Sequence, residues 1–149
     1  LFYLANNIIT NAQGEVLCDT KQERIERERM VGQKIEKFLL YDILLQQLLK
    51  SYQSAVEDPS DEMLHLYEIR DALSKHFGNS DKAKYKLKIS KNIWNRFGDL
   101  TCKKPFLQGR HRGGNYDALR SATETELNEA RSIAFGFIEA YLDYLSSKI

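Results

Sequence analysis

Residues 123–145 read TETELNEARSIAFGFIEAYLDYL, and this stretch decides the fold. Thr123, followed three positions later by Glu126, matches the capping box with which many helices begin. Apolar residues then recur every three or four positions, at Leu127, Ala130, Ile133, Ala134, Phe137, Ile138, Tyr141, Leu142 and Leu145. This spacing predicts an amphipathic helix whose apolar side must be covered by other helices. The stretch therefore indicates a helical bundle.

Helical spacing also dominates residues 20–100. A broad apolar stripe from Ile25 to Tyr52 predicts a core-facing helix that ends at Glu57-Asp58-Pro59-Ser60, because proline restricts the residue before it. A second helix is predicted from Ser60 or Asp61 to Gly78, since glycine is typical of helix C-termini. Two shorter helices are predicted, the first capped by Ser80-Asp81 and the second by Ser90.

The segment 82–89, KAKYKLKI, permits two interpretations. Its strict alternation of lysine with other residues is typical of a half-exposed strand. The capping residues before it and the short helix after it favour a helix. As a strand, the segment would pair with the N-terminal hairpin described next.

Residues 1–19 differ from the rest of the chain. Two short β-type runs, residues 8–10 and 16–18, flank the turn cluster Asn11-Ala12-Gln13-Gly14, which predicts a β-hairpin. This hairpin either packs on the helices or is the remnant of a preceding segment. We therefore expect a mainly α protein. It consists of one helical-bundle domain of four to six helices, residues 20–149, after a small hairpin.

The composition excludes several classes of protein. With 149 residues, 42% of them hydrophobic and 29% charged, the chain suits one globular domain. No apolar run is long enough to cross a bilayer, so we expect no membrane partner. Cys18 and Cys102 lie far apart, which favours two thiols in a reducing cytoplasm, the alternative being one long-range disulfide. Without metal-ligand spacing or a nucleotide motif, the sequence predicts neither a metal nor a cofactor.

Charge is distributed unevenly along the chain. Residues 82–112 contain ten of the 22 Lys and Arg residues but only one acid, Asp99, and so carry a net charge of +9. The remaining 12 basic and 20 acidic residues give −8. Four aromatic residues, Tyr85, Trp94, Phe97 and Phe106, are interleaved with these charges. Such a stretch indicates a phosphate-rich partner, most simply nucleic acid, or an acidic protein surface.

The first half of this basic stretch resembles a helix-turn-helix. The resemblance lies in the spacing Leu87-x-Ile89-Ser90-x-x-x-Trp94, although Lys88 stands where that turn usually has glycine. It implies that the second helix offers polar side chains to a DNA groove, namely Lys91, Asn92, Asn95 and Arg96. The alternative interpretation is a structural corner whose lysines are solvated.

The second half, residues 103–114, is predicted to be a loop that binds an anion. It holds Lys103, Lys104, Arg110 and Arg112 without any acid. Its glycines, at positions 109, 113 and 114, permit a positive φ and a close approach of the backbone to the anion. His111, between two arginines, suits a neutral hydrogen-bond donor or acceptor. The alternative is internal, with Arg110 and Arg112 paired to Asp117 or Glu126.

A third candidate lies in the helix that ends near Gly78. Arg70 and His76, six positions apart, resemble the R-x(4–6)-H signature of HEPN-type ribonucleases. The resemblance implies a dimer that cleaves RNA without metal, with His76 as general acid and base and Arg70 as the stabiliser of charge. The alternative is structural, because a histidine near a helix C-terminus interacts favourably with the helix dipole.

Taken together, these patterns favour a non-enzymatic interaction domain that binds nucleic acid through the basic stretch. The alternatives are a metal-independent ribonuclease, which implies a homodimer, and a structural or protein–protein interaction module. The candidate binding residues are Lys84, Lys91, Asn95, Arg96, Lys103, Lys104, Arg110, His111 and Arg112.

Overall fold

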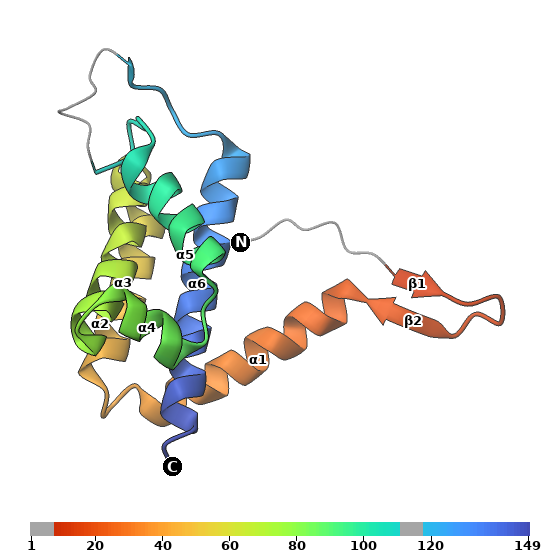
Figure 1. Ribbon diagram of the computed structural model, residues 1–149. Helices are drawn as coiled ribbons and strands as arrows, with labels where there is room; N and C mark the ends of the chain where they lie inside the picture. Colours follow the sequence, from red (N-terminus) through yellow and green to blue (C-terminus); the bar gives the residue numbers. More distant parts are fainter. Residues whose placement is uncertain (1–7, 111–117) are drawn as a thin grey trace. The chain divides into compact units, whose positions relative to one another are not determined.

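The computed structural model describes residues 8–110 and 118–149. Within them, six α-helices follow one two-stranded hairpin (Figure 1), which confirms the predicted mainly α fold. The chain divides into two compact units, residues 1–37 and 38–149. This division falls near the end of the first helix.

The first unit contains the predicted hairpin. Strands β1 (Ile8–Thr10) and β2 (Val16–Asp19) are antiparallel, with Ile8 opposite Asp19 and an irregularity between Ile9 and Thr10. The Asn11 side chain fixes the turn by accepting hydrogen bonds from the amides of Gln13 and Glu15, both at 3.0 Å. Gly14 has φ +80°, a conformation that glycine adopts without a steric cost.

Helix α1 (Thr20–Phe38) follows β2 directly. The Asp19 carboxylate accepts hydrogen bonds from the first-turn amides of Lys21 and Gln22, both at 3.1 Å. The apolar stripe from Ile25 to Tyr52 is not one helix, because α1 ends at Phe38 and α2 begins at Ile43. Asp42 makes the break, since its side chain accepts a hydrogen bond from the Leu45 amide at 2.7 Å.

The second unit contains the other five helices. Helix α2 (Ile43–Glu57) is followed by the short 3-10 turn η1 (Pro59–Asp61) and by α3 (Glu62–Phe77). As expected, α3 stops at Gly78, which has φ +96°. The remaining elements are α4 (Ser80–Leu87), α5 (Lys91–Gly98), the π-helical turn η2 (Asp99–Lys103) and α6 (Glu124–Ser146). Segment 82–89 is therefore helical over most of its length, not a strand.

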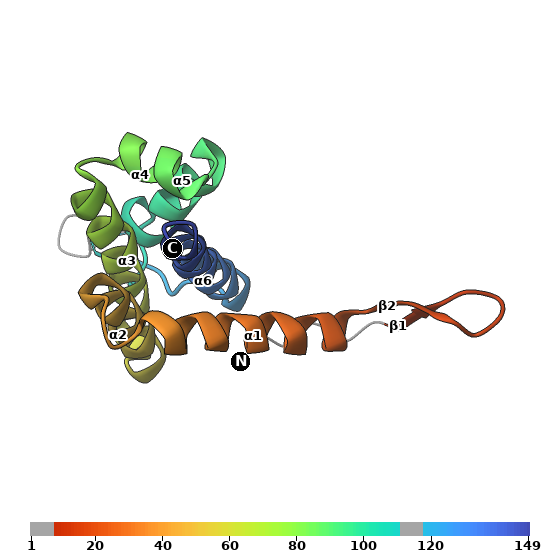
Figure 2. The ribbon, with the colours of Figure 1, turned by 90° about the horizontal axis from the view of Figure 1, so that it is seen from below.

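Helix α6 is the centre of this unit. It begins with the predicted capping box of Thr123 and Glu126, and it packs against α2, α3, α4 and α5. Figure 2 looks along α6, with α2 and α3 on one side of it and α4 and α5 on another. The buried Glu62 of α3 forms an ion pair with Arg131 of α6, whose Nη2 donates at 2.9 Å. Among the helices of the described residues, none combines the length and the apolar character that crossing a membrane requires.

Candidate functional site

The basic corner formed by α4 and α5 is held by two side-chain caps. Asn79, and not the expected Ser80 or Asp81, caps α4 by accepting a hydrogen bond from the Lys82 amide at 2.9 Å. Ser90 caps α5 as predicted, accepting from the Ile93 amide at 3.2 Å. Two short helices therefore meet at a sharp turn that the local sequence determines.

Lys88 lies at this turn in the left-handed conformation. Its φ is 54° and its ψ is 37°, and it is the only non-glycine residue with positive φ in the described part of the chain. A side chain makes this conformation unfavourable, which is why helix-turn-helix motifs usually have glycine here. The Lys88 amide donates to the carbonyls of Lys84 and Tyr85 and so ends α4. The backbone thus adopts the glycine-type turn although the residue is lysine.

One side of the corner belongs to the core. Ala83 and Leu87 of α4 and Trp94 and Phe97 of α5 are all buried. The rings of both α5 aromatics contact Phe137 of α6, with centroid distances of 5.2 Å for Trp94 and 5.0 Å for Phe97. Trp94 therefore anchors α5 to the core of the unit.

Most candidate cations of the basic stretch are paired with acids. Lys84 contacts Asp81 at 2.8 Å, and Lys103 contacts Asp99 at 2.8 Å, both within about one helical turn. The remaining two pairs reach α6: Arg96 donates to both carboxylate oxygens of Glu129 at 2.7 Å, and Lys104 contacts Glu126 at 2.9 Å. Their charges are therefore largely compensated within the unit.

Glu126 is the most strongly stabilised of these acids. Arg120 donates two hydrogen bonds to its carboxylate, at 2.8 and 2.9 Å, and these lower the pKa of Glu126 far below its usual range, with the Thr123 backbone and Lys104 contributing. The guanidinium of Arg120 and the ammonium of Lys104 also lie near the ring of the buried Phe106, at 4.6 and 5.7 Å from its centroid. The alternative interpretation of the loop pairs Arg110 and Arg112 with Asp117 or Glu126, whereas the arginine bound to Glu126 in the structure is Arg120.

The predicted anion loop is only partly described. Arg110 lies over the ring of Tyr67, with its Cζ 4.6 Å from the centroid, and His111 and Arg112 lie outside the described residues. Gly109 does not have the positive φ expected of it. Its role is to permit close packing, because a Cβ there would lie 3.1 Å from the Phe106 carbonyl oxygen.

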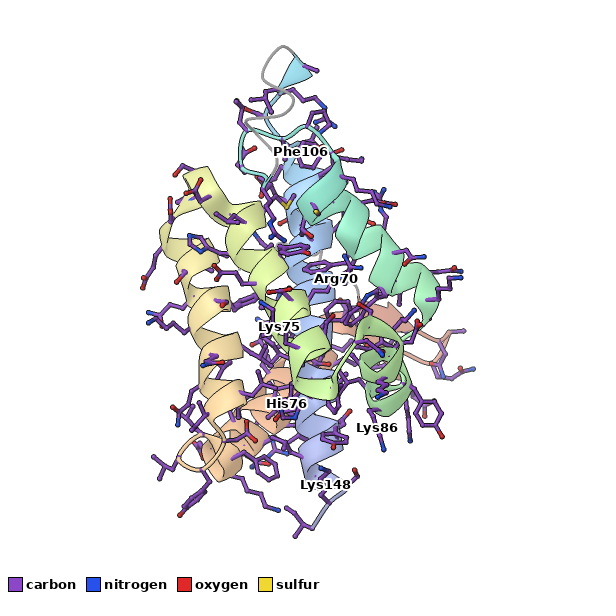
Figure 3. All side chains as sticks on the ribbon, turned by 60° about the vertical axis from the view of Figure 1, so that its left-hand side comes forward. Arg70, Lys75, His76, Lys86, Phe106 and Lys148 are labelled. Carbon is purple, nitrogen blue, oxygen red and sulfur yellow. The ribbon has the colours of Figure 1, made fainter. Side chains whose placement is uncertain are left out.

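Four lysines remain on the outer side of the α4–α5 corner, and we call them the lysine corner: Lys82, Lys86, Lys88 and Lys91. All four are exposed, and none of the ion pairs among the described residues includes them. Figure 3 shows Lys86 at the edge of the bundle, on α4. Tyr85, which is 81% exposed, lies among these lysines, and Asn92 and Asn95 are exposed on α5.

The candidate binding residues from the sequence include Lys91 and Asn95 of this corner but not Lys82, Lys86 or Lys88. The helical periodicity of α4 was the signal that could have found them. Ala83 and Leu87 point to the core, so Lys82 and Lys86 must face away from it. Lys84, which was chosen instead, has a half-buried side chain that is engaged with Asp81.

Arg70 and His76 lie at different positions along α3 and have different neighbours (Figure 3). The Arg70 guanidinium lies 5.2 Å from the centroid of the Trp94 ring, on the side of α5. The His76 ring contacts Phe77 and Tyr141 edge-on, at 4.8 and 5.9 Å. The structure does not bring the two side chains together within one chain, and the ribonuclease interpretation stays a prediction.

His76 lines a hollow of about 730 Å³ between α2, α3 and α6. The Tyr141 hydroxyl donates there to both carboxylate oxygens of Asp42, each at 3.1 Å. Burial and the Asp42 charge raise the pKa of Tyr141 far above its usual value. Lys75 pairs with Asp71 at 2.6 Å on the same rim. This hollow is separate from the lysine corner, since it contains none of its residues.

The described residues contain no group of three or more His, Cys, Asp and Glu side chains that could hold a metal ion. Cys18 and Cys102 are both free thiols. A scan against protein-family models and searches of curated proteins and of solved structures each found no match for this chain. What the chain does is therefore inferred from its own residues.

Proposed function

We propose that residues 38–149 form a binding domain whose lysine corner holds a phosphate-rich polyanion, most simply nucleic acid. One observation carries the proposal: the four exposed lysines of the lysine corner take part in none of the ion pairs of the described residues, whereas most of the other described cations of the basic stretch do. Charges without acid partners are free to attract phosphate.

The physical basis is counterion release. Each lysine that neutralises a phosphate releases bound cations, which gives a slope per contact of about −0.9 on duplex DNA and about −0.7 on a single strand in a plot of log affinity against log salt concentration. Four contacts would give a slope of about −3.6 on a duplex and about −2.8 on a single strand. Arg96 should add less to this slope than a free lysine, because Glu129 accepts hydrogen bonds from Nε and Nη2 along one edge of its guanidinium.

The ion pairs support a different role for Arg96 and Lys104 of the basic stretch and for Arg120 beyond it. Lys104 and Arg120 share Glu126, and Arg96 joins α5 to α6 through Glu129. These contacts favour the structural interpretation for these residues. We therefore restrict the proposed binding surface to the lysine corner and assign Arg96, Lys104 and Arg120 to the stability of the bundle.

The test is fluorescence anisotropy with a labelled nucleic acid at about 50 to 200 mM salt. We expect affinity that falls steeply with salt and that is largely lost when Lys82, Lys86, Lys88 and Lys91 are all changed to Gln. The matched control changes four exposed lysines elsewhere, Lys50, Lys75, Lys103 and Lys148, and removes the same total charge. Equal loss in both variants, or binding that does not depend on salt, contradicts the proposal.

A further inference from the structure

Of the four aromatic residues in the basic stretch, three are buried and one is exposed. Trp94, Phe97 and Phe106 are each at most 1% exposed and belong to the core. Tyr85 is 81% exposed and lies on α4 among the lysines. An aromatic ring left this open on a packed helix contributes little to stability. It offers instead a flat apolar face to a partner.

Tyr85 is also one wall of a hollow of about 300 Å³. Its other lining residues are Phe77, Asp81, Lys82 and Lys86. Phe77 is a fixed wall, because its ring packs edge-on against Tyr144 and Tyr141 of α6, with centroid distances of 5.1 and 6.4 Å. The hollow thus combines two aromatic side chains with two lysines.

The charges around this hollow favour a ligand with both a ring and a phosphate. Asp81 is its only acid, and Lys84 binds that carboxylate at 2.8 Å and lowers its pKa. The Lys82 side chain bends back over the end of α3, with its Nζ 3.8 Å from the place where a Cβ on Gly78 would lie. Lys86 adds a second ammonium group to the lining. The net charge of the residues that line the hollow is therefore positive.

These observations distinguish between two forms of nucleic acid. In a duplex the faces of the bases are stacked on one another and cannot reach Tyr85. A helix-turn-helix that reads a duplex would use α5, but Arg96 of that helix is engaged with Glu129. In a single strand every base has a free face, and an exposed aromatic ring beside lysines is the usual means of holding it.

We infer that the hollow beside Tyr85 holds an unpaired base and that the partner of the lysine corner is single-stranded nucleic acid. This inference rests on the proposed function and specifies its ligand. The base lies against the Tyr85 ring between the stems of Lys82 and Lys86, and the lysine ammonium groups contact the flanking phosphates. Phe77 closes the inner side of the hollow.

The test compares a labelled single strand with the same sequence in a duplex, using wild type and two variants of Tyr85. Tyr85→Ala should weaken binding of the single strand about five- to 150-fold, the equivalent of about 1–3 kcal/mol for one stacked base. Tyr85→Phe keeps the ring and should stay within about twofold of wild type, since stacking does not need the hydroxyl. Tyr41→Ala is the matched control, because Tyr41 is 84% exposed and lies outside this hollow.

The outcomes separate the two proposals. A loss of single-strand affinity in Tyr85→Ala alone, with duplex affinity unchanged, supports the unpaired base. Unchanged single-strand affinity in Tyr85→Ala, or an equal loss for both ligands, overturns it while the salt-dependent binding of the lysine corner still stands. If wild type binds neither ligand at low salt, the proposed function fails and this inference fails with it.

Discussion

The guanidinium group of Arg70 occupies the space that a side chain at position 98 would need. A Cβ built on Gly98 would collide with Nη1 of Arg70 and lie within 3.0 Å of its Cζ. Gly98 itself has ordinary helical angles, φ −62° and ψ −36°, so its backbone does not require glycine. Position 98 is glycine because Arg70 lies between α3 and α5 above the Trp94 ring.

Replacing Gly98 by Ala should therefore destabilise the protein, although alanine favours helices. We expect Gly98→Ala to lower the free energy of unfolding by about 1–3 kcal/mol, the usual cost of overpacking, measured by chemical denaturation. The new Cβ can be accommodated only if the end of the Arg70 side chain shifts, which gives up its contact with the ring of the buried Trp94.

Two further variants test the cause of this loss. Gly136→Ala changes another helical glycine, with no atom within 4 Å of the new Cβ, and should raise stability by about 0.5–1 kcal/mol. In an Arg70→Ala background, Gly98→Ala should no longer be harmful. Equal effects of Gly98→Ala in both backgrounds would mean that Arg70 is not the obstacle.

Glu126 should make the stability depend on pH in acid. Its pKa in the folded protein is lowered, first by Arg120 and also by the Thr123 backbone and Lys104. A group with a lowered pKa adds stability above its unfolded pKa, near 4.3, and loses it as the pH falls toward the folded value. We expect unfolding free energies measured across this range to decline more steeply in wild type than in Glu126→Gln.

Glu126→Gln isolates the charge, because glutamine also completes a capping box. At neutral pH the variant should be less stable by about 1 kcal/mol, and the difference should shrink below about pH 4. Glu124→Gln removes an acid from the same first turn, but its side chain is 72% exposed, so a smaller loss is expected. A gap between wild type and Glu126→Gln that stays constant down to low pH would exclude this role of the carboxylate.

The parts of the fold that the sequence predicted are those that local residues determine. The capping box at Thr123, the C-terminal Gly78 and the cap at Ser90 each act within a few positions of the chain. The break between α1 and α2 was missed because the run from Phe38 to Leu49 has no glycine or proline. Asp42 makes that break, and its partner Tyr141 lies 99 residues away.

The candidate site likewise has contacts that local residues determine and contacts that depend on how distant helices pack. Composition counts charges but does not show which of them are compensated. The pairs of Lys84 with Asp81 and of Lys103 with Asp99 could have been read from helical spacing once the helices were assigned. The pair of Arg96 with Glu129 spans 33 residues and depends on how α5 packs against α6. Sequence spacing alone carries no signal for it.

Tyr141 should contribute to stability through its hydroxyl group. It donates to both carboxylate oxygens of Asp42, which also caps α2. Tyr141→Phe leaves the buried ring in place and should lower the free energy of unfolding by about 1.5–3 kcal/mol, the range for hydrogen bonds to charged groups. Tyr144→Phe is the control, because no described hydrogen bond uses its hydroxyl as donor, and it should cost much less. Similar losses in both variants would show that the bond to Asp42 adds little.

Lys88 has a structural role in the turn between α4 and α5 and a proposed role in binding phosphate, and one substitution can separate these two roles. Lys88→Gly relieves the left-handed conformation, worth about 1–2 kcal/mol, at an entropic cost of about 0.5–1 kcal/mol. We expect the variant to be more stable by about 0.5–1 kcal/mol in chemical denaturation. If the ammonium group contacts phosphate, the same variant should bind single-stranded nucleic acid more weakly, with a salt slope reduced by about 0.7.

Lys88→Ala is the matched comparison, because it removes the same charge but keeps the Cβ that makes the turn unfavourable. It should lose as much affinity as Lys88→Gly without gaining stability. If both variants bind as wild type does, Lys88 is a structural residue only, and the lysine corner is reduced to Lys82, Lys86 and Lys91. If Lys88→Gly is no more stable than Lys88→Ala, the left-handed turn is not a source of strain in this protein.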